Sequence, residues 1–494
     1  MTDAPMTDPA EAAIADLTTR LRAAREAAAT DPFGDPVLLI ALAISRRMDD
    51  GSLDEVTVGR MLGRLATAAA TDRAGRIAAY VGLDRGEAAL PALAARIVRP
   101  DPQDSPVPFA AFRAAVERPR FAAVFTAHPT FSLPRSTAAA LARAACGEAL
   151  PEGLSHRPAA PTLEEEFEQA AEAIARGRDA ADALNRALLE AARGVWGDRW
   201  MGLTPRSVIL ASWVGYDTDG RTDIGWWDTL RLRLLMKRLG LARLAAQLEP
   251  LGECAQVLRG RVTAALEAVD AQLAVAPRRA DPPEVQSFAA QLVDRREAAL
   301  TDTAALIEQF ASALHTAPDD ATRMALAVAR AGLAAHGLSL AHTHVRLNAS
   351  QLHNALRQRL GIADAPDDMA RRRGLLATIN TALAEVEPQP VDLGALLAEQ
   401  ASAARLMMTV AQIAKHVDAS QPVRFLVAET ESGYTLLAAL WLARRFGVER
   451  HVEISPLFET AEALERGDRV IEEALRSPHF RDYLRLHGRL CLQF

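Results

Sequence analysis

Apolar positions recur at a spacing of roughly 3.6 residues along most of this 494-residue chain, in stretches rich in Ala, Leu, Arg and Glu. This spacing is typical of amphipathic helices, and these residue types favour them. No fixed repeat of roughly 30–50 residues is present, which disfavours a stack of helical repeats. Pro-rich stretches between the helices predict loops. The clearest predicted helices span residues 10–28, 54–70, 163–193, 229–247, 284–316 and 393–416.

Six short segments break this pattern. Each is brief and apolar, and several contain β-branched or aromatic residues, as buried strands do. Long helical stretches separate most of them, which favours parallel pairing through helical crossovers. The six predicted strands span residues 121–130, 206–215, 338–347, 423–430, 451–459 and 487–494.

Polar or ionisable residues gather at the carboxyl ends of most of these predicted strands. In a (β/α) barrel, this rim carries the active-site groups. We therefore predict an α/β fold that is mostly helical, with an incomplete TIM-type barrel surrounded by many helices. The strand-end residues are His128, Asp217, Arg346, Glu429 and Glu459.

The number of predicted strands is too small to form a closed barrel. A TIM barrel needs eight strands, and the chain supplies about six of them. Either strands are missed, or the chain is a fragment, or a partner completes it. The pattern predicts a helical N-terminal region over residues 1–120 and a partial barrel with long helical insertions over residues 121–494.

Composition and charge narrow the class of protein. With 50% hydrophobic and 24% charged residues, the chain can build a large core. No apolar run approaches the roughly 18–20 residues that span a bilayer, and the acidic N-terminus has no signal-peptide pattern. Three widely spaced cysteines form neither a disulfide framework nor a zinc motif. These features predict a cytoplasmic protein that does not bind membranes.

The charged residues argue against nucleic-acid binding. The formal net charge is −7 and no basic run is present. The 56 basic residues include only two lysines, Lys237 and Lys415, which leaves 54 arginines. Arginine suits phosphate and carboxylate ligands. Codon usage in a GC-rich genome explains most of the excess.

The segment from Val124 to Thr130 is the most specific local motif. Alternate strand residues share a face, so Thr126, His128 and Thr130 should point together. Pro129 should end the strand and leave His128 at the rim, where an imidazole can take part in acid–base chemistry. A single histidine at a strand end is otherwise most often structural.

Four motifs in order resemble those of the phosphoenolpyruvate carboxylase family. The string Thr-Ala-His-Pro-Thr at 126–130 resembles its first signature, and Ser-Trp-Val-Gly-Tyr-Asp-Thr-Asp-Gly at 212–220 is similar to its Ser-Trp-Met-Gly-Gly-Asp-Arg-Asp-Gly loop. His-Val-Arg-Leu-Asn at 344–348 stands where the family has Asp-Ile-Arg-Gln-Glu. Ser-Pro-Leu-Phe-Glu-Thr at 455–460 resembles Val-Pro-Leu-Phe-Glu-Thr. The resemblance covers residues 120 to 494.

The resemblance implies carboxylation of phosphoenolpyruvate by bicarbonate, which gives oxaloacetate and phosphate with Mg²⁺ or Mn²⁺ as cofactor. Carried over by motif, His128 would act as base, Arg346 would contact phosphate or carboxyphosphate, and Glu459 would bind the metal. Substrate binding would also involve Arg135, Trp213 and Asp217.

Each of these residues also has a structural interpretation. Glu459 could be a solvated carboxylate, Arg346 a partner in an ion pair and Trp213 part of the core. Asp217 and Asp219 could chelate a metal, but shaping the loop or pairing with an arginine is the favoured interpretation. His342 and His344 share a strand face that could suit a metal, although no third ligand is evident nearby.

Departures from the family pattern predict a diverged site. Phe131 and Pro134 replace polar residues and leave Arg135, and Thr218 and Arg221 replace an arginine and an asparagine. The third motif, at residues 344–348, differs from the family pattern at His344, Leu347 and Asn348. In the family's order, the strand with the second metal carboxylate and the loop that covers the substrate would follow Phe494.

Two hypotheses follow. The chain is the N-terminal portion of a carboxylase, truncated or split, and does not turn over alone. Alternatively, it is a non-catalytic homologue that binds a phosphorylated ligand or a partner subunit. Relatives are generally homotetramers, so the resemblance implies a homo-oligomer or a complementing C-terminal segment.

Overall fold

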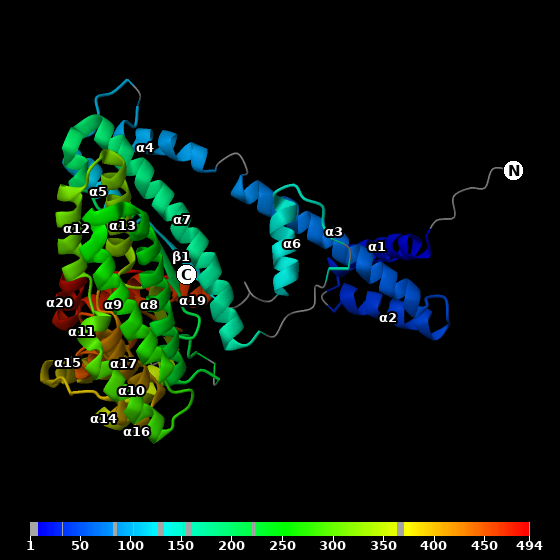
Figure 1. The fold of residues 1–494 in the computed structure, drawn as a ribbon. Coiled ribbons are helices and arrows are strands. Elements are labelled where there is room, and N and C mark those ends of the chain that lie inside the picture. The colour runs from blue at the N-terminus through cyan, green and yellow to red at the C-terminus, as the bar shows by residue number, and fades with distance from the viewer. Residues whose placement is uncertain are drawn as a thin grey trace. The chain divides into compact units, whose positions relative to one another are not determined.

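The computed structural model describes residues 8–493 except 32, 83–85, 102, 127–132, 152, 155–160, 220, 222 and 363–369. The chain packs into two compact units, drawn as ribbons in Figure 1. The first comprises Met1–Gly86 and Thr130–Ala160, and the second comprises Glu87–Pro129 and Pro161–Phe494. The predicted boundary at residue 120 therefore falls inside the second unit.

The first unit is a small helical assembly. Asp8, Asp35 and Asp54 cap the first three helices by accepting hydrogen bonds from first-turn N–H groups. Its buried residues are few, and apolar side chains such as Val37 and Leu62 remain largely exposed. Its helices are α1 (Pro9–Ala28), α2 (Pro36–Asp49), α3 (Glu55–Val81) and α6 (Arg135–Ala145).

The second unit contains a parallel sheet of five strands in sequential order, β1-β2-β3-β4-β5. Every connection carries at least one helix, as parallel pairing requires. All residues of β5 are buried, which fits a parallel sheet covered on both faces. The strands are β1 (Phe121–Phe125), β2 (Val208–Ser212), β3 (His342–Asn348), β4 (Val423–Ala428) and β5 (Val452–Pro456).

Helices pack round this sheet (Figure 1). Helices α7 and α13 contact β2, α14 contacts β3 and α18 contacts β5. The helices of this unit are α4 (Leu90–Val98), α5 (Phe109–Val116), α7 (Leu163–Trp196), α8 (Trp226–Leu248), α9 (Gln256–Ala274), α10 (Pro282–Asp294), α11 (Arg296–Ala299), α12 (Ala304–Thr316), α13 (Asp320–His336), α14 (Ala349–Leu360), α15 (Arg372–Glu385), α16 (Leu393–Ala398), α17 (Ser402–Gln412), α18 (Gly433–Arg445), α19 (Ala461–Leu475) and α20 (Pro478–His487). Short 3-10 turns span Glu87–Ala89, Gly197–Gly202 and Glu249–Ala255, and a π-helical turn spans Ile413–Val417.

Helix α18 is buried on every face. All residues from Gly433 to Ala443 are buried, and the helix packs against β5, α14, α15 and α19. A Cβ on Gly433 would lie 2.6 Å from the backbone nitrogen of Ala474, so only glycine fits there. This helix is part of the core rather than a cover over it.

The mostly helical α/β prediction is confirmed, but the described residues form five paired strands rather than six and do not show a closed barrel. The prediction of a strand from residue 487 is wrong at its start. Helix α20 runs to His487, and Gly488 ends it in the left-handed conformation with φ +70°. Among the described residues, the chain then forms an isolated bridge between Gln493 and Leu457, the residue that follows β5.

An ion-pair network fastens this last segment to the sheet. Glu453, on β5, accepts hydrogen bonds from Arg424 on β4 and from Arg489, at 2.7–2.9 Å. Burial alone would raise the pKa of Glu453, but the hydrogen bonds and charges of the two arginines lower it below its ordinary value. The carboxylate therefore stays ionised although it is 8% exposed.

A buried polar cluster lies where the chain enters β3. Lys237, fully buried on α8, donates to the carbonyls of Leu300 and Val417 at 2.6 and 2.7 Å. Asp418 accepts hydrogen bonds from Arg233 and from the N–H of Leu338. Burial lowers the pKa of Lys237 to about 7, despite the nearby charge of Asp418. A neutral amine has two N–H donors, which match its two carbonyl partners.

The stability of this protein should therefore depend on pH through Lys237. An unfolded chain keeps this proton up to its ordinary pKa of 10.5, whereas the folded chain releases it near pH 7. Between these values the unfolded state binds more protons, so this residue makes stability rise with pH by roughly 1.4 kcal/mol per pH unit. Lys237→Met should remove this slope, as measured by urea unfolding between pH 6.5 and 9.5.

The matched control is Lys415→Met, which removes the other lysine of the chain, an exposed one. It should keep the slope of the wild-type protein. Equal slopes in wild type and Lys237→Met would contradict the assignment of the buried amine.

Candidate functional site

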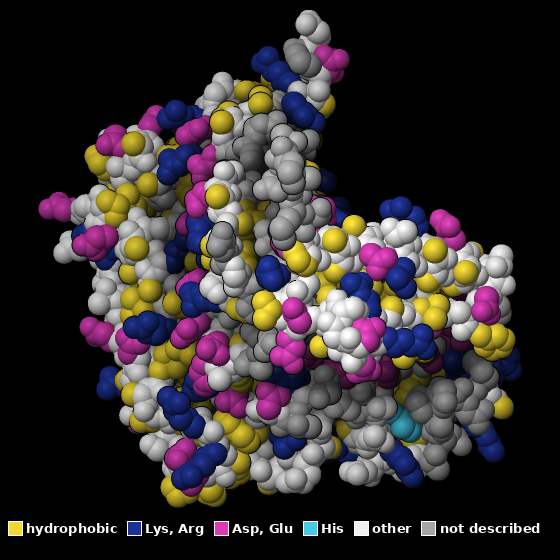
Figure 2. Space-filling model, turned by 90° about the vertical axis from the view of Figure 1, so that its right-hand side faces the viewer, with side chains coloured by type: hydrophobic (Ala, Val, Ile, Leu, Met, Phe, Trp, Pro, Cys, Tyr) yellow, Lys and Arg dark blue, Asp and Glu magenta, His cyan; other side chains and the backbone are white. Residues whose placement is uncertain are grey.

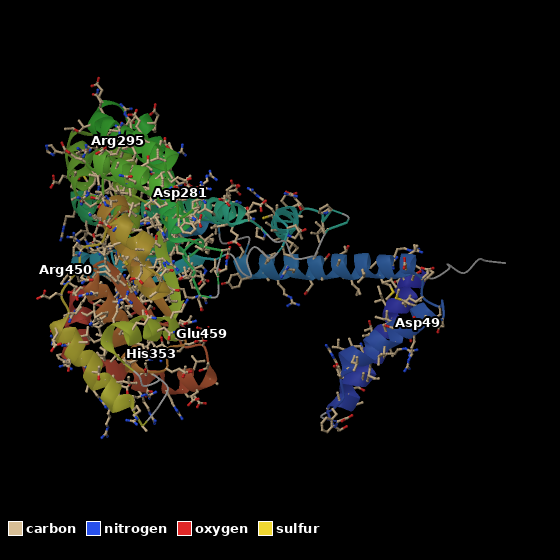
Figure 3. The ribbon with its side chains drawn as sticks, turned by 90° about the horizontal axis from the view of Figure 1, so that it is seen from below. Asp49, Asp281, Arg295, His353, Arg450 and Glu459 are labelled. Atoms are coloured by element: carbon tan, nitrogen blue, oxygen red, sulfur yellow. The ribbon has the colours of Figure 1, made fainter. Side chains whose placement is uncertain are left out.

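The carboxyl ends of the five parallel strands meet at one edge of the sheet. The loop Trp213–Asp219 follows β2, and Arg346 and Asn348 lie at the end of β3. Glu429 follows β4, and Glu459, labelled in Figure 3, follows β5. We call this edge the carboxyl rim.

An ion pair between Arg346 and Asp217 is the centre of the described rim. Arg346 Nε and Nη2 each donate to one carboxylate oxygen of Asp217, both at 3.0 Å. This two-bond geometry is the strongest arrangement that an arginine makes with a carboxylate. Asp219 lies 3.8 Å from Arg346 Nε and accepts a hydrogen bond from the Asn348 amide at 3.1 Å.

The conformation of the loop after β2 brings Asp217 to Arg346. Gly215 has φ +82°, and a Cβ there would lie 2.1 Å from Leu232 Cδ1, so no other residue fits without a shift. The N–H and hydroxyl of Thr218 both donate to the Arg346 carbonyl. A bridge between Asp217 and Arg346 extends the pairing of β2 with β3 beyond the strand.

The half-buried ring of Trp213 lies beside the same guanidinium. The Arg346 Cζ atom is 5.1 Å from the ring centre, within the range of a cation–π contact. Burial alone would lower the pKa of Arg346, but the hydrogen bonds and charge of Asp217, with Asp219 and Glu459 adding to them, raise it above its ordinary value. Arg346 therefore stays a cation, and it interacts electrostatically with Glu459 from two strands away.

Two exposed glutamates complete the described rim. A Glu459 carboxylate oxygen accepts a hydrogen bond from the backbone N–H of Glu429 at 3.3 Å. Glu429 has φ +56°, a left-handed conformation that is uncommon for residues other than glycine. Such strain persists only where the surroundings impose it, and it often marks functional sites.

The remaining predicted residues have different positions. His128 lies outside the described residues. Arg135 is the exposed first residue of α6, in the first unit. His344 is 2% exposed in the middle of β3, and burial lowers its pKa well below the ordinary value, so it is neutral. Across the described ranges, no group of three His, Cys, Asp or Glu residues could hold a metal.

The family model described as phosphoenolpyruvate carboxylase matches residues 242–492, about half of the chain. The chain belongs to the phosphoenolpyruvate carboxylase family. No curated protein matches it. At the level of the family, the match indicates a carboxylase-type enzyme, a lyase whose substrates are phosphoenolpyruvate and bicarbonate. The matched range contains Arg346 and Glu459, whereas the loop after β2 precedes it.

Phosphoenolpyruvate carboxylases generally depend on a divalent metal, and the rim fits one kind of site for it. Mg²⁺ is commonly held by one or two carboxylates together with substrate phosphate and water. Glu459, an exposed rim carboxylate, fits that role. Asp217 fits it less well because both of its carboxylate oxygens accept hydrogen bonds from Arg346. The described rim thus suits a metal that arrives with its substrate, not a preformed protein cage.

The residues of the carboxyl rim are predicted from the sequence, but several contacts between their side chains are not. The contact between Trp213 and Arg346 and the hydrogen bond between Asn348 and Asp219 were not predicted. The departure from the family pattern at position 348 was a signal, because an amide can donate to an aspartate and a glutamate cannot. Nothing in the sequence indicated the backbone strain at Glu429.

Relief of this strain should stabilise the protein. Glu429→Gly and Glu429→Ala remove the same carboxylate, but only glycine adopts a positive φ at little cost. We expect the glycine variant to be more stable than the alanine variant by about 0.5–1 kcal/mol, measured by urea unfolding. An alanine variant of equal or greater stability would show that position 429 is not strained.

Proposed function

We propose that the carboxyl rim serves the carboxylation of phosphoenolpyruvate with bicarbonate to oxaloacetate and phosphate, in this chain alone or together with a complementing C-terminal segment. The observation that carries the proposal is the position of Arg346 and Glu459, two residues of the family-matched range that lie at the carboxyl ends of β3 and β5 in one parallel sheet. A cation for the phosphoryl group and a carboxylate for a metal are what this reaction requires.

The proposed reaction begins when a bicarbonate oxygen attacks the phosphorus of phosphoenolpyruvate. The bond from phosphorus to the enol oxygen breaks and leaves carboxyphosphate and the pyruvate enolate. Carboxyphosphate then releases CO₂ and phosphate, and C3 of the enolate attacks CO₂ to give oxaloacetate. His128 is proposed as the base that takes the proton from carboxyphosphate.

Arg346 would bind the phosphoryl group in this proposal. Asp217 engages its Nε and Nη2 atoms and fixes the plane of the guanidinium, while Trp213 lies beside it. Within the described part of the chain, no hydrogen bond engages the Nη1 atom, so this nitrogen can donate to a phosphoryl oxygen. Asp217 thus acts as a positioning residue.

Glu459 would hold the divalent metal with the substrate. A bound Mg²⁺ supplies stabilisation of the negative charge on the enolate oxygen. The hydrogen bond from the Glu429 N–H to Oε1 orients the Glu459 carboxylate, and no described residue engages its Oε2, which can therefore bind the metal.

A second candidate function is the binding of a phosphorylated ligand without turnover. The departures from the family pattern at the rim favour it, because they remove charged and amide side chains from a site that still presents Arg346. The neutral residues His344 and Leu347, where the family has Asp and Gln, support the same interpretation.

Calorimetric titration with phosphoenolpyruvate and Mg²⁺, combined with an oxaloacetate assay in bicarbonate, tests both candidates. Arg346→Gln should lower kcat/KM by roughly 100-fold or more, since it removes a charge-assisted contact to the reacting group. Glu459→Gln should abolish the Mg²⁺-dependent formation of oxaloacetate, because the proposed metal ligand is lost. Glu465→Gln, an exposed substitution on α19, is the matched control and should behave as wild type.

The outcomes separate the candidates. Oxaloacetate formation that depends on Arg346 supports the carboxylase. Binding that depends on Arg346 without any oxaloacetate supports a chain that does not turn over alone, either a non-catalytic homologue or a carboxylase portion that needs a complementing segment. If phosphoenolpyruvate does not bind, or binds equally well to Arg346→Gln, both candidates fail.

A further inference from the structure

A cavity of about 320 Å³ lies next to the loop that follows β2. Its wall includes Thr218 from that loop, Gln351 from the first turn of α14, and Ser402 and Arg405 from the first turn of α17. Neither Arg346 nor Glu459 lines it, so it is separate from the site proposed above.

The described residues that line this cavity carry positive charge only. The charged ones among them are Arg221 and Arg405. Arg221 is already neutralised, because it donates to Asp223 at 2.7 and 2.8 Å and to Glu166 at 3.4 Å. Arg405 is half-buried, and its side chain makes no hydrogen bond or ion pair in the described part of the chain. An unpaired guanidinium beside a polar cavity is a binding group for an anion.

Neutral hydrogen-bond donors surround this cation. The N-cap residue Ala401 makes no side-chain capping hydrogen bond to the first turn of α17, the turn that carries Ser402 and Arg405. The hydroxyl of Ser402 is exposed in the same turn. Gln351 accepts from the Asn348 N–H through its oxygen, so its NH₂ group remains a donor.

We propose that this cavity binds a small oxyanion, a phosphate or carboxylate group, with Arg405 as its principal ligand. Its volume is near the lower limit for small-molecule pockets, which suits a compact ion rather than a nucleotide. The planar fork of Arg405 offers paired donors to two oxygens of one group, and the hydroxyl of Ser402 and the amide of Gln351 supply further hydrogen bonds.

The bound anion would lie close to the rim without being part of it. Thr218 lines the cavity, and its N–H and hydroxyl both donate to the Arg346 carbonyl. Asp217 and Asp219, on either side of Thr218, contact Arg346. One short loop thus forms a wall of both sites, although the proposal for the cavity does not depend on the proposed carboxylation.

Calorimetric titration of the full chain with inorganic phosphate, and separately with succinate, tests the proposal. Arg405→Gln should weaken binding of the preferred anion by roughly 10-fold or more, since a charge-assisted contact is lost. Arg405→Lys keeps the charge but loses the fork, and should bind with intermediate affinity. Arg357→Gln is the matched control, because Arg357 is exposed on α14 and does not line the cavity.

Arg346→Gln distinguishes this site from the rim. The proposal expects this variant to bind the anion as wild type does, and the preferred anion identifies the chemical group that the cavity takes. Three results would overturn the proposal: neither anion binds, Arg405→Gln binds as tightly as wild type, or only Arg346→Gln loses binding. A failure of the carboxylase assay would leave all of these measurements unaffected.

Discussion

The ion pair between Arg346 and Asp217 is the interaction on which the architecture of the rim depends. It joins the loop after β2 to the end of β3 beyond the last regular pairing of those strands. It also sets the plane of the guanidinium beside Trp213. If the pair were broken, a half-buried cation and carboxylate would each lose a partner, at a cost of several kcal/mol in buried cases.

The polar residues at the two ends of the strands differ in burial and in their partners. Where the chain enters β3, buried groups such as Lys237 and Asp418 are satisfied by backbone carbonyl and N–H groups. At the carboxyl rim, Glu429 and Glu459 are exposed and make few contacts. The buried cluster at the start of β3 therefore stabilises the fold, whereas the carboxyl rim presents groups that a ligand can reach.

The sequence allowed the strands β1 to β5 to be predicted because each is a short apolar run between long helical patterns. It misled at residues 487–494, since the amphipathic pattern of α20 extends to His487 before Gly488 ends the helix. The rim residues Arg346 and Glu459 were predictable from their motifs, because strand ends of a parallel sheet share an edge. The strain at Glu429 and the cavity beside Arg405 were not, since both arise from contacts between segments far apart in the chain.

The burial of α18 has a consequence for how this protein can evolve. Nearly every side chain of that helix is enclosed, and Gly433 has no room for a Cβ, so most substitutions there would unfold the chain. The exposed strand ends carry no such constraint, and two positions that differ from the family pattern, Thr218 and Asn348, lie beside them. Mutational drift can therefore alter the binding chemistry of this scaffold while leaving its folding intact, which separates the selection of a new ligand from the maintenance of stability.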